Sequence, residues 1–95
     1  MRWNELDTIG TEGSEGGSIV RDEEYRGVCR ITLEQCADRC AITCGVYGAM
    51  VHTVYCGADH DAVYNAMKTD LQAFMEKDTA QEEEFAFYEE FIKRY

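Results

Sequence analysis

The chain has 95 residues, of which 9 are Lys or Arg and 19 are Asp or Glu, so its formal net charge is −10. A chain of this length buries little more than about 60% of the surface that its unfolded form exposes, which is enough for one hydrophobic core and no second domain. The negative charge repels phosphate, so it disfavours direct binding to nucleic acid and to an anionic membrane surface.

The N-terminal segment, residues 1–18, is polar and rich in glycine. It lacks the apolar run of a secretory signal, and we therefore expect the protein in the cytoplasm. Glycine loses much entropy on ordering, and residues 10–18 have little apolar surface to bury, which predicts a mobile loop. The apolar stretches farther along the chain fall short of the ~20 residues that a membrane-spanning helix needs.

Residues 19–57 alternate apolar and polar side chains with the period of two that is typical of half-buried β-strands. The alternation is clearest in three runs, which carry Cys29, Ile31 and Leu33, then Cys40, Ile42, Cys44 and Val46, then Met50, His52, Val54 and Cys56. Residues 35–39 and Gly48 can turn the chain between the runs, and a short further strand is expected at 18–21. We predict an antiparallel sheet of two to four strands.

Residues 59–95 show the three- and four-residue spacing of apolar side chains that indicates two helices. Asp59 or Asp61 is the expected N-cap of the first helix. Thr79 and Glu82 have the spacing of a capping box at the start of the second helix. The chain is therefore predicted to be one α+β domain, 1–95, in which two C-terminal α-helices cover a small antiparallel sheet.

The same periodicities predict the core. It should consist of the apolar side chains on the inner face of the sheet and on the matching face of the first helix, namely Cys29, Ile31, Leu33, Ile42, Val46, Val54, Met67, Leu71 and Phe74. The second helix carries more apolar surface than one packing face requires, so part of it is expected to meet another chain. Its main stripe is predicted to be Phe85, Tyr88, Ile92 and Tyr95, widened by Phe87 and Phe91.

The five cysteines are candidate metal ligands. Cys36, Cys40 and Cys44 are four residues apart, but an extended strand would hold the last two sulfurs more than about 10 Å apart, unlike the tight knuckle of structural zinc sites. An odd number of cysteines in a chain without a signal favours reduced, buried thiols. We expect no metal, no cofactor and no disulfide, and a thiol-based redox or zinc sensor remains as an alternative.

Catalytic motifs are not apparent. A cysteine nucleophile with His52 or His60 as its base would need positive surroundings, whereas Asp59 and Asp61 flank His60. The glycine-rich run lacks the lysine of a phosphate-binding loop. We therefore expect a protein that is not an enzyme.

Small size, strong acidity and the lack of a catalytic motif favour a protein-binding module. DNA mimics, anti-CRISPR proteins and nuclease immunity proteins share this profile, and they occupy the basic nucleic-acid-binding surface of a partner. The expected partner is a protein with a basic surface, such as a nucleic-acid-binding enzyme, and the expected contact residues are Asp22, Glu23, Glu24, Glu82, Glu83, Glu84, Phe87, Glu89, Glu90 and Phe91. The alternative is a structural or regulatory domain that forms a homodimer through its aromatic helix.

Overall fold

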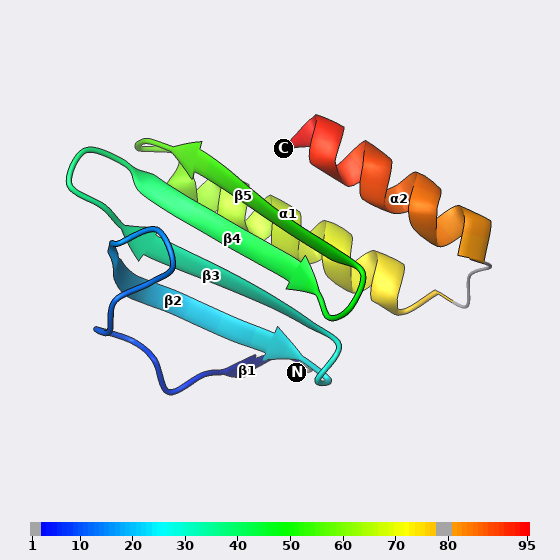
Figure 1. The fold of residues 1–95 in the computed structure, drawn as a ribbon, viewed down its shortest axis with the longest axis horizontal. Coiled ribbons are helices and arrows are strands. Elements are labelled where there is room, and N and C mark those ends of the chain that lie inside the picture. The colour runs from blue at the N-terminus through cyan, green and yellow to red at the C-terminus, as the bar shows by residue number, and fades with distance from the viewer. Residues whose placement is uncertain (1–2, 78–80) are drawn as a thin grey trace.

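The protein folds into a five-stranded antiparallel sheet followed by two helices (Figure 1). The computed structural model describes residues 3–77 and 81–95. The strands neighbour one another in chain order, and the elements are β1 (Trp3–Glu5), β2 (Ser18–Tyr25), β3 (Cys29–Gln35), β4 (Cys40–Val46), β5 (Met50–Cys56), α1 (His60–Met75) and α2 (Gln81–Arg94). The α+β class and the C-terminal position of both helices are confirmed, whereas the sheet has more strands than predicted.

The three strands with clear alternation form as predicted, as β3, β4 and β5. The strand expected at 18–21 is longer and continues to Tyr25. β1 was not predicted, because three residues are too few to show a period. It is held by the buried side chain of Trp3, whose ring lies 5.2 Å from that of Tyr25 and whose Nε1 donates a hydrogen bond to Gln72 of α1.

Short turns make consecutive strands neighbours. Between β2 and β3, Arg26 and Gly27 have positive φ values of 53° and 70°, and the amide of Val28 donates to the carbonyl of Tyr25. Between β4 and β5, Gly48 has a φ of 77°. Positive φ is strained for most residues and free for glycine, so these glycines favour tight hairpins.

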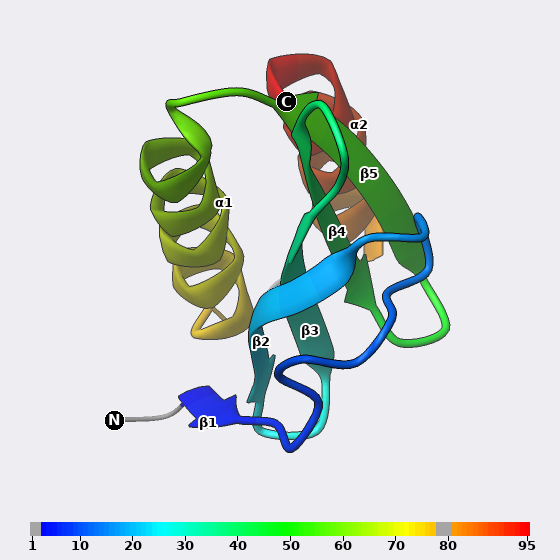
Figure 2. The same cartoon turned by 90° about the vertical axis from the view of Figure 1, so that its left-hand side faces the viewer.

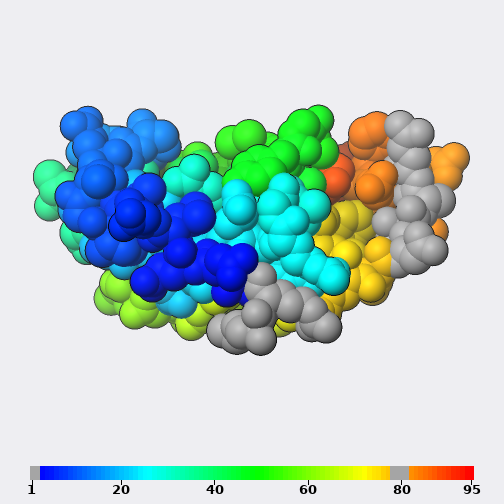
Figure 3. Space-filling model, turned by 90° about the horizontal axis from the view of Figure 1, so that it is seen from below, coloured from blue at the N-terminus to red at the C-terminus, as the bar shows by residue number. Residues whose placement is uncertain are grey.

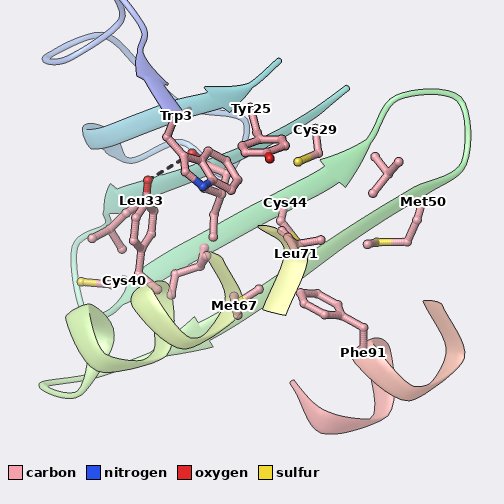
Figure 4. Packing of buried hydrophobic residues seen from close by; sticks show 14 residues of the cluster. Trp3, Tyr25, Cys29, Leu33, Cys40, Cys44, Met50, Met67, Leu71 and Phe91 are labelled. Atoms are coloured by element: carbon pink, nitrogen blue, oxygen red, sulfur yellow. Dashed lines mark hydrogen bonds between the residues drawn. The ribbon is translucent and has the colours of Figure 1, made fainter. Parts of the chain in front are cut away.

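The core lies between the sheet and the helices. Figure 2 shows α1 on one side of the sheet and the segment between β1 and β2 on the other, and Figure 4 shows the packed side chains. Of the nine predicted core residues eight are buried, and Val54 is partly buried and packs against the others. Tyr64 of α1 joins the core, and its hydroxyl donates to Glu23 at 2.8 Å.

Asp59 is the N-cap of α1, as predicted, although its side chain makes no capping hydrogen bond. The buried side of α1 consists of Tyr64, Met67, Leu71 and Phe74, which have helical spacing. The first turn of α2 carries three glutamates, which favour the positive end of a helix dipole. Thr79, the other half of the predicted capping box, lies outside the described residues.

The segment between β1 and β2 lies against one end of the sheet (Figure 3). The carboxylate of Glu34, a side chain that is 1% exposed, accepts hydrogen bonds from the backbone amides of Glu15 and Gly17. The amide of Gly10 donates to the carbonyl of Ile19. Composition alone predicts a mobile loop here. It does not reveal that a buried carboxylate in β3 accepts hydrogen bonds from the backbone of this segment.

Candidate protein-binding surfaces

α2 packs against the rest of the protein through one side. The ring of Phe87 stacks on that of Phe74 of α1, with centroids 4.0 Å apart and planes within 4° of parallel. Phe91 is 1% exposed and meets the ring of His52 of β5 edge-on. Tyr95 lies against Phe91, with ring centroids 4.9 Å apart. The helix is thereby held alongside β5, the last strand of the sheet (Figure 1).

This packing corrects the predicted aromatic stripe. Phe87 and Phe91, which were expected to widen it, are the side chains that contact the core, together with Tyr88 and Tyr95. Phe85 and Ile92 point away from the core and are 58% and 43% exposed. The helix is rotated relative to the prediction, because its phase is set by the aromatic rings of α1 and β5.

The exposed side of α2 combines apolar and acidic side chains. Phe85 and Ile92 are seven residues apart, so they lie on one side of the helix, with Glu89 between them. Four glutamates of α2 are exposed, and none forms a salt bridge with a residue that the structure describes. We call this surface the α2 outer face, and it consists of Phe85, Ile92, Glu82, Glu83, Glu89 and Glu90.

Several residues that were predicted to contact a partner are not available to one. Asp22 is completely buried and Phe91 is 1% exposed, so both leave the predicted contact set. Glu23 faces α1, where Lys68 Nζ lies 2.6 Å from its carboxylate. Phe87 and Glu84 are half-buried. Glu24 lies on the opposite face of the sheet from the helices and accepts a 2.5 Å hydrogen bond from the hydroxyl of Tyr47.

The face of the sheet opposite the helices contains a groove that the sequence analysis missed. The register places the open-face residues of β3, β4 and β5 in three rows, which are Arg30–Gly45–Val51, Thr32–Thr43–Thr53 and Glu34–Ala41–Tyr55. β4 therefore contributes only small side chains to this face. The resulting hollow, the open-face groove, has a volume of about 690 Å³.

The two walls of the open-face groove differ in character. One wall is formed by the N-terminal segment, including Thr11 and Glu12. The other wall is formed by Tyr47 and Val51 of the β4–β5 hairpin, which are 51% and 77% exposed. The alternation of small residues in β4 is the sequence signal that could have indicated this groove.

Asp22 and Arg30 hold the floor of the groove in place. The Asp22 carboxylate accepts hydrogen bonds from Arg30 Nε at 2.9 Å, from Arg30 Nη2 at 2.5 Å and from the hydroxyls of Thr8 and Thr32. Burial by itself would raise the pKa of Asp22, but these hydrogen bonds outweigh it, and the pKa of this carboxyl is lowered. The hydrogen bond from Thr8 to Asp22 therefore ties the N-terminal segment to the sheet.

Burial raises the pKa of each of the five thiols. All five cysteines are free, and burial raises the pKa of Cys29 to about 11 and that of Cys44 to about 12. Burial also raises the pKa of Cys40 and of Cys56, which lie opposite each other on β4 and β5. No cluster of three or more His, Cys, Asp or Glu side chains arranged to hold a metal ion occurs within 3–77 and 81–95.

We expect all five thiols to react with a thiol reagent after denaturation, and Cys29 and Cys44 to react far more slowly in the folded protein. Both are buried and have raised pKa values, so little thiolate forms. Titration with and without denaturant measures this. Fewer than five reactive thiols under denaturing, non-reducing conditions, or stoichiometric zinc in a chelator-washed sample, would contradict it.

No protein-family model, curated protein or solved structure matches this chain. Neither described helix is long and apolar enough to cross a membrane.

Proposed function

We propose that this protein is a non-enzymatic binding module that uses the α2 outer face to occupy a basic surface of a partner protein, such as the nucleic-acid-binding surface of an enzyme. The observation that carries the proposal is the combination of Phe85 and Ile92, both exposed, with four exposed glutamates that form no salt bridge with a described residue. The packing of α2 does not require these six side chains, because its aromatic residues on the other side contact the core.

The two kinds of side chain supply different parts of binding. Exposed carboxylates attract a basic surface over roughly a Debye length, about 8 Å at physiological salt, and mainly raise the association rate. Phe85 and Ile92 would be buried on contact and would mainly slow dissociation. The carboxylates of a DNA mimic must compete with phosphate groups for the same cationic groove. Apolar contacts, which phosphate groups do not make, add to the affinity of the mimic.

The partner is to be captured from a lysate of the source cells and its binding measured with the purified protein. We expect the Glu83→Lys, Glu90→Lys double variant to associate about tenfold more slowly at low salt, and the difference to shrink as salt is added. The matched control is Glu5→Lys with Asp38→Lys, which makes the same change in net charge at exposed positions outside α2.

The apolar contribution is tested separately with Phe85→Ala, which should accelerate dissociation with little effect on association. Val28→Ala, at an exposed position of the β2–β3 turn, is its control. Heparin or duplex DNA should compete with the protein for its partner. The proposal fails if the Glu83→Lys, Glu90→Lys variant binds the partner as well as the Glu5→Lys, Asp38→Lys control. It also fails if neither heparin nor duplex DNA competes. A stable homodimer that loses its stability with Phe85→Ala would instead support the homo-oligomeric alternative.

A further inference from the structure

The open-face groove is the other surface whose shape and chemistry suggest a ligand. Its volume of about 690 Å³ falls within the range of about 300–1,000 Å³ that ligand pockets commonly have. It is separate from the α2 outer face, because it lies on the side of the sheet away from α1 and is lined by none of the six residues of that face.

The charges around the groove favour a cation. Glu12 and Glu34 line it, Asp22 binds the lining residue Arg30, and Glu24 binds the lining residue Tyr47. Two carboxylates, those of Glu12 and Glu34, line the groove itself, and the one cationic side chain of its lining, Arg30, already donates two hydrogen bonds to Asp22. An anionic ligand would therefore be repelled.

A recurring arrangement within this protein indicates which cation. The Tyr64 hydroxyl donates to Glu23 while the guanidinium carbon of Arg21 lies 4.0 Å from the Tyr64 ring centroid. Tyr55 likewise donates to Glu15, and the guanidinium carbon of Arg39 lies 4.0 Å from the Tyr55 ring centroid.

Tyr25 repeats the arrangement more loosely. Its hydroxyl donates to Glu76, and the guanidinium carbon of Arg26 lies 5.8 Å from the Tyr25 ring centroid. In each case the ring attracts the guanidinium, and the carboxylate at the hydroxyl adds negative charge.

Two tyrosines that donate to a carboxylate, Tyr95 and Tyr47, have no cation from the described residues over the ring, and of the two only Tyr47 lines the groove. The Tyr47 hydroxyl donates to Glu24, and its ring is half exposed on the groove wall. The apolar side chain of Val51 lies on the same wall, and Gly45 opens the floor beside it.

We propose that the open-face groove binds an arginine-bearing peptide segment, with an arginine side chain on the Tyr47 ring beside Glu24 and an apolar side chain of the same segment against Val51. Only the choice of a polypeptide as the ligand rests on the proposed function. Arginine fits better than lysine, because its planar guanidinium can stack on the ring and hydrogen-bond to the carboxylate together.

The test uses three fluorescein-labelled hexapeptides, acetyl-(Arg-Val)₃-amide and its Lys-Val and Glu-Val counterparts, with anisotropy to measure affinity and NMR to locate the contact. We expect the arginine peptide to bind at least fivefold more tightly than the lysine peptide, the glutamate peptide not to bind, and the amides of Tyr47, Val51 and Gly45 to shift.

Variants then locate the arginine. Tyr47→Leu should weaken binding at least fivefold, whereas Tyr47→Phe should retain most of it because the ring remains. Tyr55→Leu is the matched control, since Tyr55 is similarly exposed on the same face but already carries Arg39. Gly45→Val should also weaken binding by filling the floor, and melting curves confirm that each variant folds.

The proposal is overturned if the glutamate peptide binds as tightly as the arginine peptide, if Tyr47→Leu has no effect, or if Tyr55→Leu weakens binding equally. It is also overturned if the peptide shifts only α2 amides. Glu83→Lys with Glu90→Lys and Phe85→Ala should leave peptide binding unchanged, so failure of the groove and failure of the α2 outer face are distinguishable.

Discussion

We expect Leu71→Ala to lower the free energy of unfolding by about 2–5 kcal/mol, a large share of the stability of a small domain. Leu71 is completely buried in the middle of α1 and belongs to the cluster that joins the sheet to both helices (Figure 4). Truncation removes apolar contacts and leaves a cavity, and Ile42→Ala on the facing strand should have an effect of similar size.

Urea denaturation followed by circular dichroism measures both effects. Val51→Ala is the control, because Val51 is 77% exposed on a strand of the same sheet and its truncation should change the unfolding free energy by no more than about 0.5 kcal/mol. An unchanged unfolding midpoint for Leu71→Ala would mean that α1 does not pack on the sheet through this face.

Asp22→Asn should be the second large effect, lowering the free energy of unfolding at neutral pH by about 1–3 kcal/mol. The variant removes the charge that Arg30 faces, weakening two charge-assisted hydrogen bonds, and disturbs those from Thr8 and Thr32. Arg30 is partly exposed and water can solvate it, which keeps the expected cost below that of a fully buried pair.

The same carboxylate makes stability depend on pH. Its pKa in the folded protein is below 3.8, the ordinary value for an aspartate, so the ionised form stabilises the fold above about pH 4, and this contribution is lost as pH falls through the folded pKa. We expect the original protein to lose stability steeply below pH 4 and Asp22→Asn to lose less over the same range.

Unfolding followed between pH 7 and pH 2 measures the difference. Asp38→Asn, at an exposed turn position, should follow the original protein. Glu23, whose pKa is also lowered, is present in every variant and leaves a residual acid dependence in Asp22→Asn. Identical pH profiles for the original protein and Asp22→Asn would show that Asp22 has no such role.

The α2 helix shows the limit of pattern analysis. Its apolar residues permit two stripes, one through Phe85 and Ile92 and one through Phe87 and Phe91, and both have helical spacing. A sequence pattern specifies that a face is buried but not which of two competing faces is. Phe74 of α1 and His52 of β5 make the choice, because they are the surfaces on which the second stripe packs.

Residues 22–24 show the same limit in a strand. Three consecutive acids are typical of a solvated surface, yet Asp22 and Glu24 have partners on the open face and Glu23 has partners on the helix face. Alternation along a strand sends neighbouring carboxylates to opposite sides. Their partners come from strand β3, the β4–β5 turn and helix α1, so no local pattern could have indicated them.

The sequence by itself determined the class of fold, three strands, both helices and nearly all of the core, because apolar periodicity is a local property that short turns convert into neighbouring strands. The tertiary structure decided which acids remain free, which aromatic side chains are exposed and where the sheet is hollow. These depend on contacts between distant segments, as when Gly45 of β4 comes to lie between Arg30 of β3 and Val51 of β5.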